Sequence, residues 1–237
     1  MSTETFNKGN LENILKELAK EYKKLGGKNM PAEIILVGGA AVIENYGFRD
    51  MTTDIDAVIF ASSVMKEAVN RLGDRLGLIN GWLNEDFKKT ESYSGHLKEV
   101  SVFYKSFYGV LNVRTVSAEY LIAMKLKAGR KYKNDLSDVV GILLEHKSKG
   151  KEITEEQISN AIIKLYGSWN TVPKDSVTFI KELLRSGDYE AVYNEIREGE
   201  KQAKKILTQF EEEYPKAINT ENVDNILKML KEKKKKL

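Results

Sequence analysis

The chain has 237 residues and a formal net charge of +3, with 41% hydrophobic, 31% charged and 9% aromatic residues. This balance excludes wholesale disorder and predicts a folded, soluble protein with a sizeable core. Cysteine is absent and there are two histidines, which excludes disulfides, thiolate nucleophiles, cysteine-bound metals and multi-histidine metal sites. Catalytic chemistry would therefore rest on carboxylates, hydroxyls, lysines and arginines, together with an oxygen-bound hard cation.

No segment has the character of a leader or of a membrane span. Residues 1–10 contain no apolar core, and no run approaches the roughly 18 apolar residues that cross a bilayer. We therefore expect a cytoplasmic protein with no membrane partner.

The first half of the chain alternates helical and strand patterns. Residues 11–25 carry apolar side chains at helical spacing, with Asn10 as the expected cap and glycines 26–27 as the stop. An apolar run over 33–37, bounded by glycines, is typical of a buried strand. The further expected elements are a short helix over 40–46, a strand over 54–60, a helix that follows Ser62 or Ser63 and includes Leu76, and strands over 97–104 and 110–116.

From residue 117 the pattern is helical almost to the end of the chain. The expected helices cover 117–128, 135–148, 154–166, 174–186, 188–212 and 221–235, and Thr154 with Gln157 forms a capping box. We place a domain boundary at Lys149-Gly150, between a core domain over 1–149 and a C-terminal helical domain over 150–237. The expected fold class is α+β, with a mixed β-sheet flanked by helices and followed by a helical region.

Positive charge is concentrated in the middle of the chain. Residues 88–149 contain 12 Lys and Arg against 6 Asp and Glu, a net +6, so the remaining sequence sums to −3. Such a section can meet phosphate groups, or it can be a solvated lysine-rich surface.

The stretch with the clearest chemical meaning covers residues 35–59. A strand ends in Gly38-Gly39 before a short helix, which leaves bare backbone N–H groups that suit phosphate oxygens. Asp54 and Asp56 follow in the next strand, where side chains two residues apart point to one face. Two adjacent carboxylates repel each other, so the pair predicts a neutralising cation, and Mg²⁺ or Mn²⁺ suits oxygen ligands.

Each of these signals alone has a simpler interpretation. Glycine is the default residue of a tight turn. An Asp-x-Asp pair also occurs at solvated strand ends. The order and the separation of the two signals make their combination much more specific.

The combination resembles the core motif of the DNA polymerase β-type nucleotidyltransferase superfamily, in which a hydrophobic residue and Gly-Gly or Gly-Ser precede Asp-hydrophobic-Asp-hydrophobic. Here Val37-Gly38-Gly39 stands 14 residues ahead of Asp54-Ile55-Asp56-Ala57. Three segments resemble the bacterial minimal and abortive-infection (AbiEii-like) toxin branch: 46–49, 53–56 and 119–128. The residues that follow the last segment, Arg130, Lys133, Asp135 and Asp138, resemble that branch as well. The resemblance covers roughly residues 30 to 145 and implies a nucleotidyltransferase-type sheet.

The resemblance also implies roles for individual residues. It implies that Asp54 and Asp56 are catalytic metal ligands and that Lys125 is a catalytic lysine directed at the nucleotide. It also implies that the nucleotide is bound by Gly38, Gly39, Thr53 and Arg130. Judged by the residues alone, Lys125 lies beside an apolar stripe, either at the edge of a cleft or snorkelling to solvent. Asp135 and Asp138 fit the first turn of a helix equally well, because the helix dipole favours carboxylates there.

The superfamily brings a third carboxylate from a later strand. In the expected strand over 97–104, alternation places Glu99 and Ser101 on one face, and Ser101 occupies the position most like the family's aspartate. Glu99 can substitute from one pleat earlier because its side chain is longer. We predict that Glu99 points toward Asp54 and Asp56 closely enough to share a cation.

The function implied by the resemblance is metal-dependent transfer of a nucleoside monophosphate from a nucleoside triphosphate (NTP) to an acceptor hydroxyl. The acceptor could be an RNA end, a protein hydroxyl or a small molecule, and the basic middle section favours RNA or another macromolecule. The toxin branch further implies an antitoxin partner. Two alternatives stay open: a catalytically inactive nucleotidyltransferase-fold module that binds a nucleotide or a partner, and a helical interaction protein in which the motif is coincidental.

Overall fold

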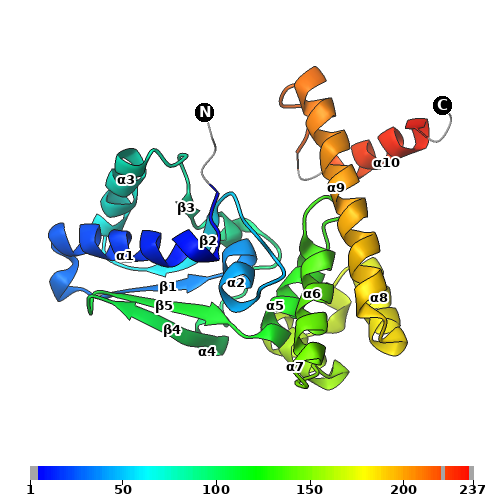
Figure 1. Ribbon diagram of the computed structural model, residues 1–237, viewed down its shortest axis with the longest axis horizontal. Helices are drawn as coiled ribbons and strands as arrows, with labels where there is room; N and C mark the ends of the chain where they lie inside the picture. Colours follow the sequence, from blue (N-terminus) through cyan, green and yellow to red (C-terminus); the bar gives the residue numbers. More distant parts are fainter. Residues whose placement is uncertain (1–4, 220–221, 235–237) are drawn as a thin grey trace.

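The sheet at the centre of the fold has five strands in the order β3-β2-β1-β5-β4. In the computed structural model, which describes residues 5–219 and 222–234, these are β1 (Ala32–Leu36), β2 (Ile55–Phe60), β3 (Leu83–Asn84), β4 (Ser101–Phe107) and β5 (Leu111–Val116) (Figure 1). β1 pairs antiparallel with β2 and parallel with β5. The mixed sheet and the helices beyond it confirm the predicted α+β class.

Helices pack on the sheet and join its strands. They are α1 (Lys8–Lys24), α2 (Gly38–Asn45), α3 (Val64–Leu76) and α4 (Leu97–Val100), with short 3₁₀ turns η1 (Gly27–Asn29) and η2 (Asp86–Lys89). In α1 the cap is Asn7 rather than the expected Asn10, because Asn7 accepts from the Gly9 and Asn10 backbone N–H groups. Asn10 completes the capping box by accepting from the Asn7 N–H.

The second half of the chain is helical, as the periodicity predicts. It contains α5 (Ala118–Ala128), α6 (Asp135–Ser148), α7 (Glu155–Tyr166), η3 (Trp169–Thr171), α8 (Lys174–Ser186), α9 (Tyr189–Glu213) and α10 (Val223–Lys234). The capping box of Thr154 and Gln157 is confirmed at the start of α7. Residues 221 and 235 of the last expected helix lie outside the described residues.

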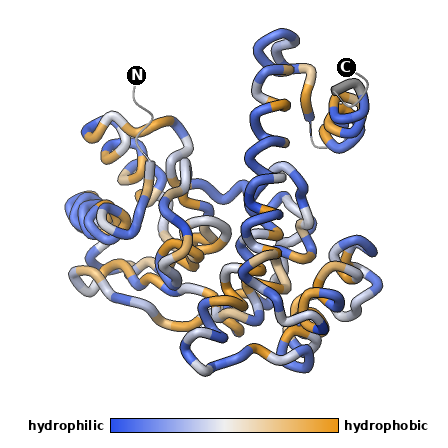
Figure 2. The backbone as a smooth tube through the Cα atoms, turned by 45° about the vertical axis from the view of Figure 1, so that its right-hand side comes forward, coloured by the Kyte–Doolittle hydropathy of each residue, from blue (hydrophilic) through white to orange (hydrophobic). Residues whose placement is uncertain are grey.

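One apolar core runs from the sheet into α5–α8, and a second, smaller cluster joins α9 to α10. In Figure 2 the apolar segments gather in the sheet and the adjoining helices, whereas the projecting part of α9 is mostly hydrophilic. α5 and α6 lie with the later helices at one end of the sheet (Figure 1). The domain boundary at residues 149–150 stays a prediction.

The expected strand over residues 97–104 is wrong in its first half. Residues 97–100 form the helical turn α4, and the strand begins at Ser101. The two-residue strand β3 had no counterpart among the expected elements. In the part of the chain that the structure describes, none of the helices combines the length and the apolar character that a membrane crossing requires.

Candidate active site

A cavity of about 910 Å³ lies between one end of the sheet and the helical half of the molecule. Such a volume accommodates a ligand of nucleotide size. The predicted site residues that line it are Gly38, Gly39, Thr53, Asp54, Asp56, Lys125 and Arg130. The structure therefore brings together residues that are spread over more than ninety positions of the sequence, and of the predicted set it leaves out Glu99.

The two glycines sit where α2 begins and where no larger residue fits. Gly38 has φ +58°, and a Cβ there would lie 3.0 Å from Asp56 Oδ2. A Cβ on Gly39 would lie 2.6 Å from Thr52 Oγ1. The first N–H groups of a helix have no partner within it, so this close, bare backbone offers donors to an anionic ligand.

Asp54 and Asp56 reach the cavity without a counter-ion of their own. Among the described residues, no Lys or Arg nitrogen lies within 4.0 Å of either carboxylate. Asp54 accepts only long hydrogen bonds, 3.4 Å each, from Thr53 Oγ1 and Asn84 Nδ2. Burial and then the neighbouring charge of Asp54 raise the pKa of Asp56 above its usual range. The pair is therefore held against its own repulsion.

This pair suits a divalent cation that is shared with a ligand. Mg²⁺ is commonly held by one or two carboxylates, with waters and substrate phosphates completing its coordination. Asp54 and Asp56 supply two such carboxylates, and the N–H groups of Gly38 and Gly39 lie beside them for the phosphates. No group of three or more metal-binding side chains occurs within residues 5–219 and 222–234. Two carboxylates would hold such an ion only with further ligands from water or from a bound phosphate group.

Lys125 is held by a second pair of carboxylates. Its Nζ lies 3.0 Å from Asp135 Oδ1 and 2.8 Å from Asp138 Oδ2, and all three side chains are buried. Burial by itself would lower the pKa of Lys125, but the two carboxylates outweigh it and raise the pKa. The snorkelling alternative does not describe this lysine, whose charged end is enclosed between α5 and α6.

Two arginines complete this charged cluster. Arg49 Nη1 lies 2.5 Å from Asp138 Oδ2, and Arg130 Nε lies 2.7 Å from Asp135 Oδ2. Burial opposes ionisation of Asp135, yet Lys125 and Arg130 hold its pKa well below the usual range. Three cations face two carboxylates, so the cluster carries a net charge of +1 toward the cavity that Arg49, Lys125 and Arg130 line.

Lys133 is a further cation of the cavity wall. No carboxylate of the described chain lies within 4.0 Å of its Nζ, in contrast to Lys125. Burial and the charge of Arg130 lower the pKa of Lys133, and the carboxylates of Asp135, Asp54 and Asp56 oppose this from a longer distance. An unpaired ammonium at the rim of a cavity is suited to an anionic ligand such as a triphosphate.

The structure does not bring Glu99 to the aspartate pair. Glu99 lies on α4, its side chain is 57% exposed, and its carboxylate contacts Lys164 Nζ at 2.5 Å and His96 Nδ1 at 3.1 Å. Alternation of side chains does not apply because residues 97–100 form a helical turn. Ser101 hydrogen-bonds to Arg114 Nε at 2.7 Å. The expected third carboxylate is thus supplied by neither residue.

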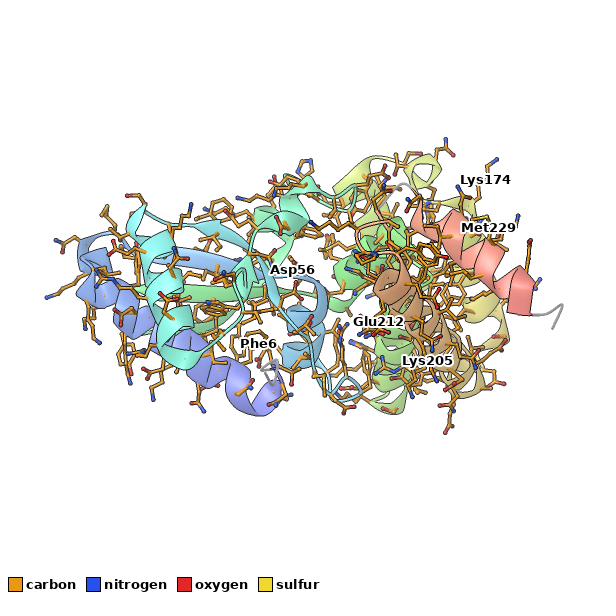
Figure 3. All side chains as sticks on the ribbon, turned by 90° about the horizontal axis from the view of Figure 1, so that it is seen from above. Phe6, Asp56, Lys174, Lys205, Glu212 and Met229 are labelled. Atoms are coloured by element: carbon orange, nitrogen blue, oxygen red, sulfur yellow. The ribbon has the colours of Figure 1, made fainter. Side chains whose placement is uncertain are left out.

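The helical end of the cavity contains residues that the motifs did not indicate. Figure 3 shows Asp56 at the end of the sheet and Glu212 of α9 across from it, and both line the cavity. The additional lining residues include Arg49, Asn84, Phe87, Tyr132, Lys204, Thr208 and Glu211. Arg49 belongs to segment 46–49, whose family likeness was its only signal. For α9 the sequence showed amphipathic periodicity and nothing that pointed to a site.

Comparison with known proteins gives one family. The profile described as "Nucleotidyltransferase of unknown function (DUF6036)" matches residues 13–149, which is more than half of the chain. No curated protein and no solved structure gave a significant match. The matched residues include the glycine pair, both aspartate pairs and Lys125. The chain therefore belongs to the DUF6036 family of nucleotidyltransferases, whose function is unknown.

Proposed function

We propose that this protein transfers a nucleoside monophosphate from an NTP to an acceptor hydroxyl and releases pyrophosphate. The observation that carries the proposal is the uncompensated pair Asp54 and Asp56 beside the N-terminus of α2. The other wall of the same cavity carries the cations Arg130, Lys133 and Lys204 as well as the acidic Glu211 and Glu212. A metal-bound NTP would complement both groups. Its phosphates would accept hydrogen bonds from the backbone N–H groups of α2, and its metal would be bound by the two carboxylates.

The chain's own residues would bind and orient the triphosphate. The first N–H groups of α2, at Gly38 and Gly39, bind phosphate oxygens, and Arg130 and Lys133 add charge-assisted contacts. Lys125 is held in one position by Asp135 and Asp138, so its charge is directed without further ordering. Thr53 lies next to Asp54 and lines the same cavity.

Asp54 and Asp56 would hold Mg²⁺ or Mn²⁺. Such an ion lowers the pKa of a nearby hydroxyl and neutralises charge that develops on the phosphates. In the transfer, the acceptor oxygen bonds to the α-phosphorus while the bond from that phosphorus to the pyrophosphate oxygen breaks. The acceptor hydroxyl loses its proton to solvent water, and pyrophosphate leaves with the electron pair of the broken bond.

The proposed acceptor is RNA or another macromolecule, and the toxin-like role with an antitoxin partner belongs to the same proposal. The excess of Lys and Arg over residues 88–149 supports it. Lys204 and Thr208 of α9 extend the cavity wall beyond the residues that the family shares. A protein hydroxyl or a small molecule as acceptor are the other outcomes of the experiment below.

A second candidate function is nucleotide binding without turnover. It is favoured by the position of Glu99, which leaves the aspartate pair without the third carboxylate that the superfamily uses. The two candidates differ in one measurable product, because only the enzyme releases pyrophosphate.

The experiment combines binding with product analysis. The protein is incubated with each α-labelled NTP, Mg²⁺ and total cellular RNA, and pyrophosphate release and label transfer to RNA, protein or small molecules are measured. We expect Asp54→Asn to lose nearly all metal-dependent binding or turnover, while Asp74→Asn, a change at an exposed position on α3, keeps both. Tight NTP binding without pyrophosphate would select the binding module. Unchanged metal-dependent activity in Asp54→Asn would contradict the site assignment.

A further inference from the structure

Glu200 is a buried carboxyl group for which the proposed reaction has no use. It lies on α9 and is 5% exposed, and no Lys, Arg or His nitrogen of the described chain lies within 4.0 Å of it. Its one hydrogen bond runs across helices, since Glu200 Oε1 accepts from the backbone N–H of Ser137 at 3.2 Å. Burying a carboxyl without a counter-ion is costly, so its position calls for a physical explanation.

The carboxylate of Glu200 accepts this hydrogen bond at the start of α6, a helix that has no side-chain cap of its own. Asn134 stands at the N-cap position and makes no capping hydrogen bond through its side chain. The N–H of Ser137 belongs to the first turn, where helical donors have no partner within the helix. Glu200 therefore does from α9 what an N-cap side chain does locally.

The turn that Glu200 holds is also the turn that carries the charged cluster. Asp135 and Asp138 flank Ser137 on both sides in the sequence, and they are the two carboxylates that hold Lys125. A tilt of this first turn would move both carboxylates and Lys125 together. Second-layer contacts of this kind fix the orientation of the groups that contact a ligand.

Unpartnered oxygens concentrate at the same place. Ser137 Oγ, Asp138 Oδ1 and Glu200 Oε2 are all buried and have no hydrogen-bond partner among the residues that the structure describes. Burial raises the pKa of Glu200 to about 7, the polar groups of Ser137 oppose the rise, and the charges of Asp138 and Asp135 add to it. A protonated Glu200 avoids a third negative charge beside these two aspartates.

The charges that face Glu200 come mainly from one neighbouring element. These are the carboxylates of Asp135 and Asp138 on α6, whose own counter-ions are Lys125 of α5, Arg49 and Arg130. None of the three cations pairs with Glu200 in the described structure. Loss of the Glu200 proton would therefore add repulsion to the cluster without a compensating contact.

We propose that Glu200 is a positioning residue of the active site, which holds the first turn of α6 and thereby the orientation of Asp135, Asp138 and Lys125. The inference rests on the proposed function for its meaning in catalysis. Glu200 lies beyond residue 149, where the family match ends. The C-terminal helices of this chain are thus a working part of the site rather than an appendage to it.

Hydrogen exchange tests the contact independently of any activity. Glu200→Met has similar volume and no acceptor, Glu200→Gln keeps an acceptor, and Glu195→Met changes an exposed glutamate on the same helix. Folding of each full-length variant is verified by its circular dichroism spectrum and melting curve. We expect faster amide exchange over residues 134–141 in Glu200→Met and no change in the other two variants. Unchanged exchange in Glu200→Met would overturn the proposal.

Kinetics then separate positioning from mere stabilisation. With labelled NTP and Mg²⁺, we expect Glu200→Met to lower kcat by about 10- to 100-fold with a much smaller change in KM. We expect the wild-type rate to fall as the pH rises through 7, and we expect Glu200→Gln to keep a kcat near that of wild type without showing this fall. Faster exchange with unchanged kcat would refute a positioning role, as would a Glu200→Gln pH profile identical to wild type. If wild type itself releases no pyrophosphate, the proposed function fails, while exchange still decides whether Glu200 holds α6.

Discussion

Two aspartate pairs lie at or next to the cavity, and the protein treats them in opposite ways. Asp135 and Asp138, on α6, are fully buried and enclosed by Lys125 and two arginines. Asp54 and Asp56, at the start of β2, remain partly exposed and have no cation within 4.0 Å in the described chain. The comparison teaches that the chain's own cations neutralise one pair, whereas the other has no such cation in the described chain and, under the proposed function, would be neutralised by a ligand.

The location of each pair explains the difference. The helix pair stands in the first turn of α6, where the helix dipole and three side-chain cations all favour negative charge. The strand pair projects next to Gly38, so close that a Cβ would touch Asp56. A charge that a ligand must reach cannot also be enclosed by side chains. The helix pair therefore determines the position of Lys125, and under the proposed function the strand pair would contact the bound ion.

The largest expected effect comes from breaking the compensated pair. Asp135→Asn leaves the buried Lys125 and the partly buried Arg130 facing a neutral amide, which should lower the free energy of unfolding by about 3 to 5 kcal/mol at pH 7. The matched control is Asp175→Asn, which removes an ion pair with Lys131 whose partners are 78% and 59% exposed and should cost less than about 1 kcal/mol. Urea unfolding of the apo-protein measures both.

The acid dependence of that effect has a defined sign. The folded-state pKa of Asp135 is depressed, so its stabilisation is complete above the unfolded pKa of about 3.9 and is lost as the pH falls further. The gap between wild type and Asp135→Asn should therefore be constant from pH 5 to 7 and narrow at more acid pH. A gap below about 1 kcal/mol at pH 7 would mean that Lys125 and Arg130 find other partners.

A smaller effect, on NTP binding rather than on stability, is expected from removing the unpaired cation Lys133. Lys133 lines the cavity without an ion pair in the described chain, so Lys133→Met should leave stability nearly unchanged. The variant should weaken NTP binding by about 5- to 10-fold, equivalent to about 1 kcal/mol. Calorimetric titration with NTP and Mg²⁺ measures it. Lys131→Met is the neighbouring control, because Lys131 pairs with Asp175 outside the cavity lining. Equal affinities in both variants would remove Lys133 from the site.

Local sequence patterns predicted most of the fold and the half of the site that lies within one motif. Apolar periodicity located α6 and α8 at their observed bounds, because a long amphipathic segment repeats its signal over several turns. The strand prediction for residues 97–100 was wrong because a segment of four residues fits the edge of a strand and a helical turn equally well. The prediction for Glu99 depended on strand alternation, so it failed together with that assignment.

The missed residues depend on contacts between distant parts of the chain. Arg49 meets Asp138 across 89 positions, and Glu200 meets Ser137 across 63. Each is a common charged residue whose surroundings in the sequence are ordinary. Only the packing of α6 against the loop before β2 and against α9 shows what they do. Tertiary burial, which no local pattern contains, separates these charges from solvated ones.

The smallest expected effect is that of Asp56→Asn on the stability of the apo-protein, and its sign is opposite to that of Asp135→Asn. Burial and the charge of Asp54 raise the folded-state pKa of Asp56, so ionised Asp56 costs stability as the pH rises through that pKa. Asp56→Asn should therefore leave the apo-protein at pH 7 equally stable or more stable, by up to about 1 kcal/mol or 2 to 4 °C in Tm. The difference should shrink as the pH falls below the raised pKa and should vanish only well below the unfolded pKa of about 3.9, where both states of wild type bind the proton. Melting curves in EDTA measure it, and Mg²⁺ with NTP should reverse the order because only wild type gains stability from the bound ligand. A drop of many degrees for apo Asp56→Asn would instead make the strand pair a structural network like the helix pair, and the distinction between the two would be lost.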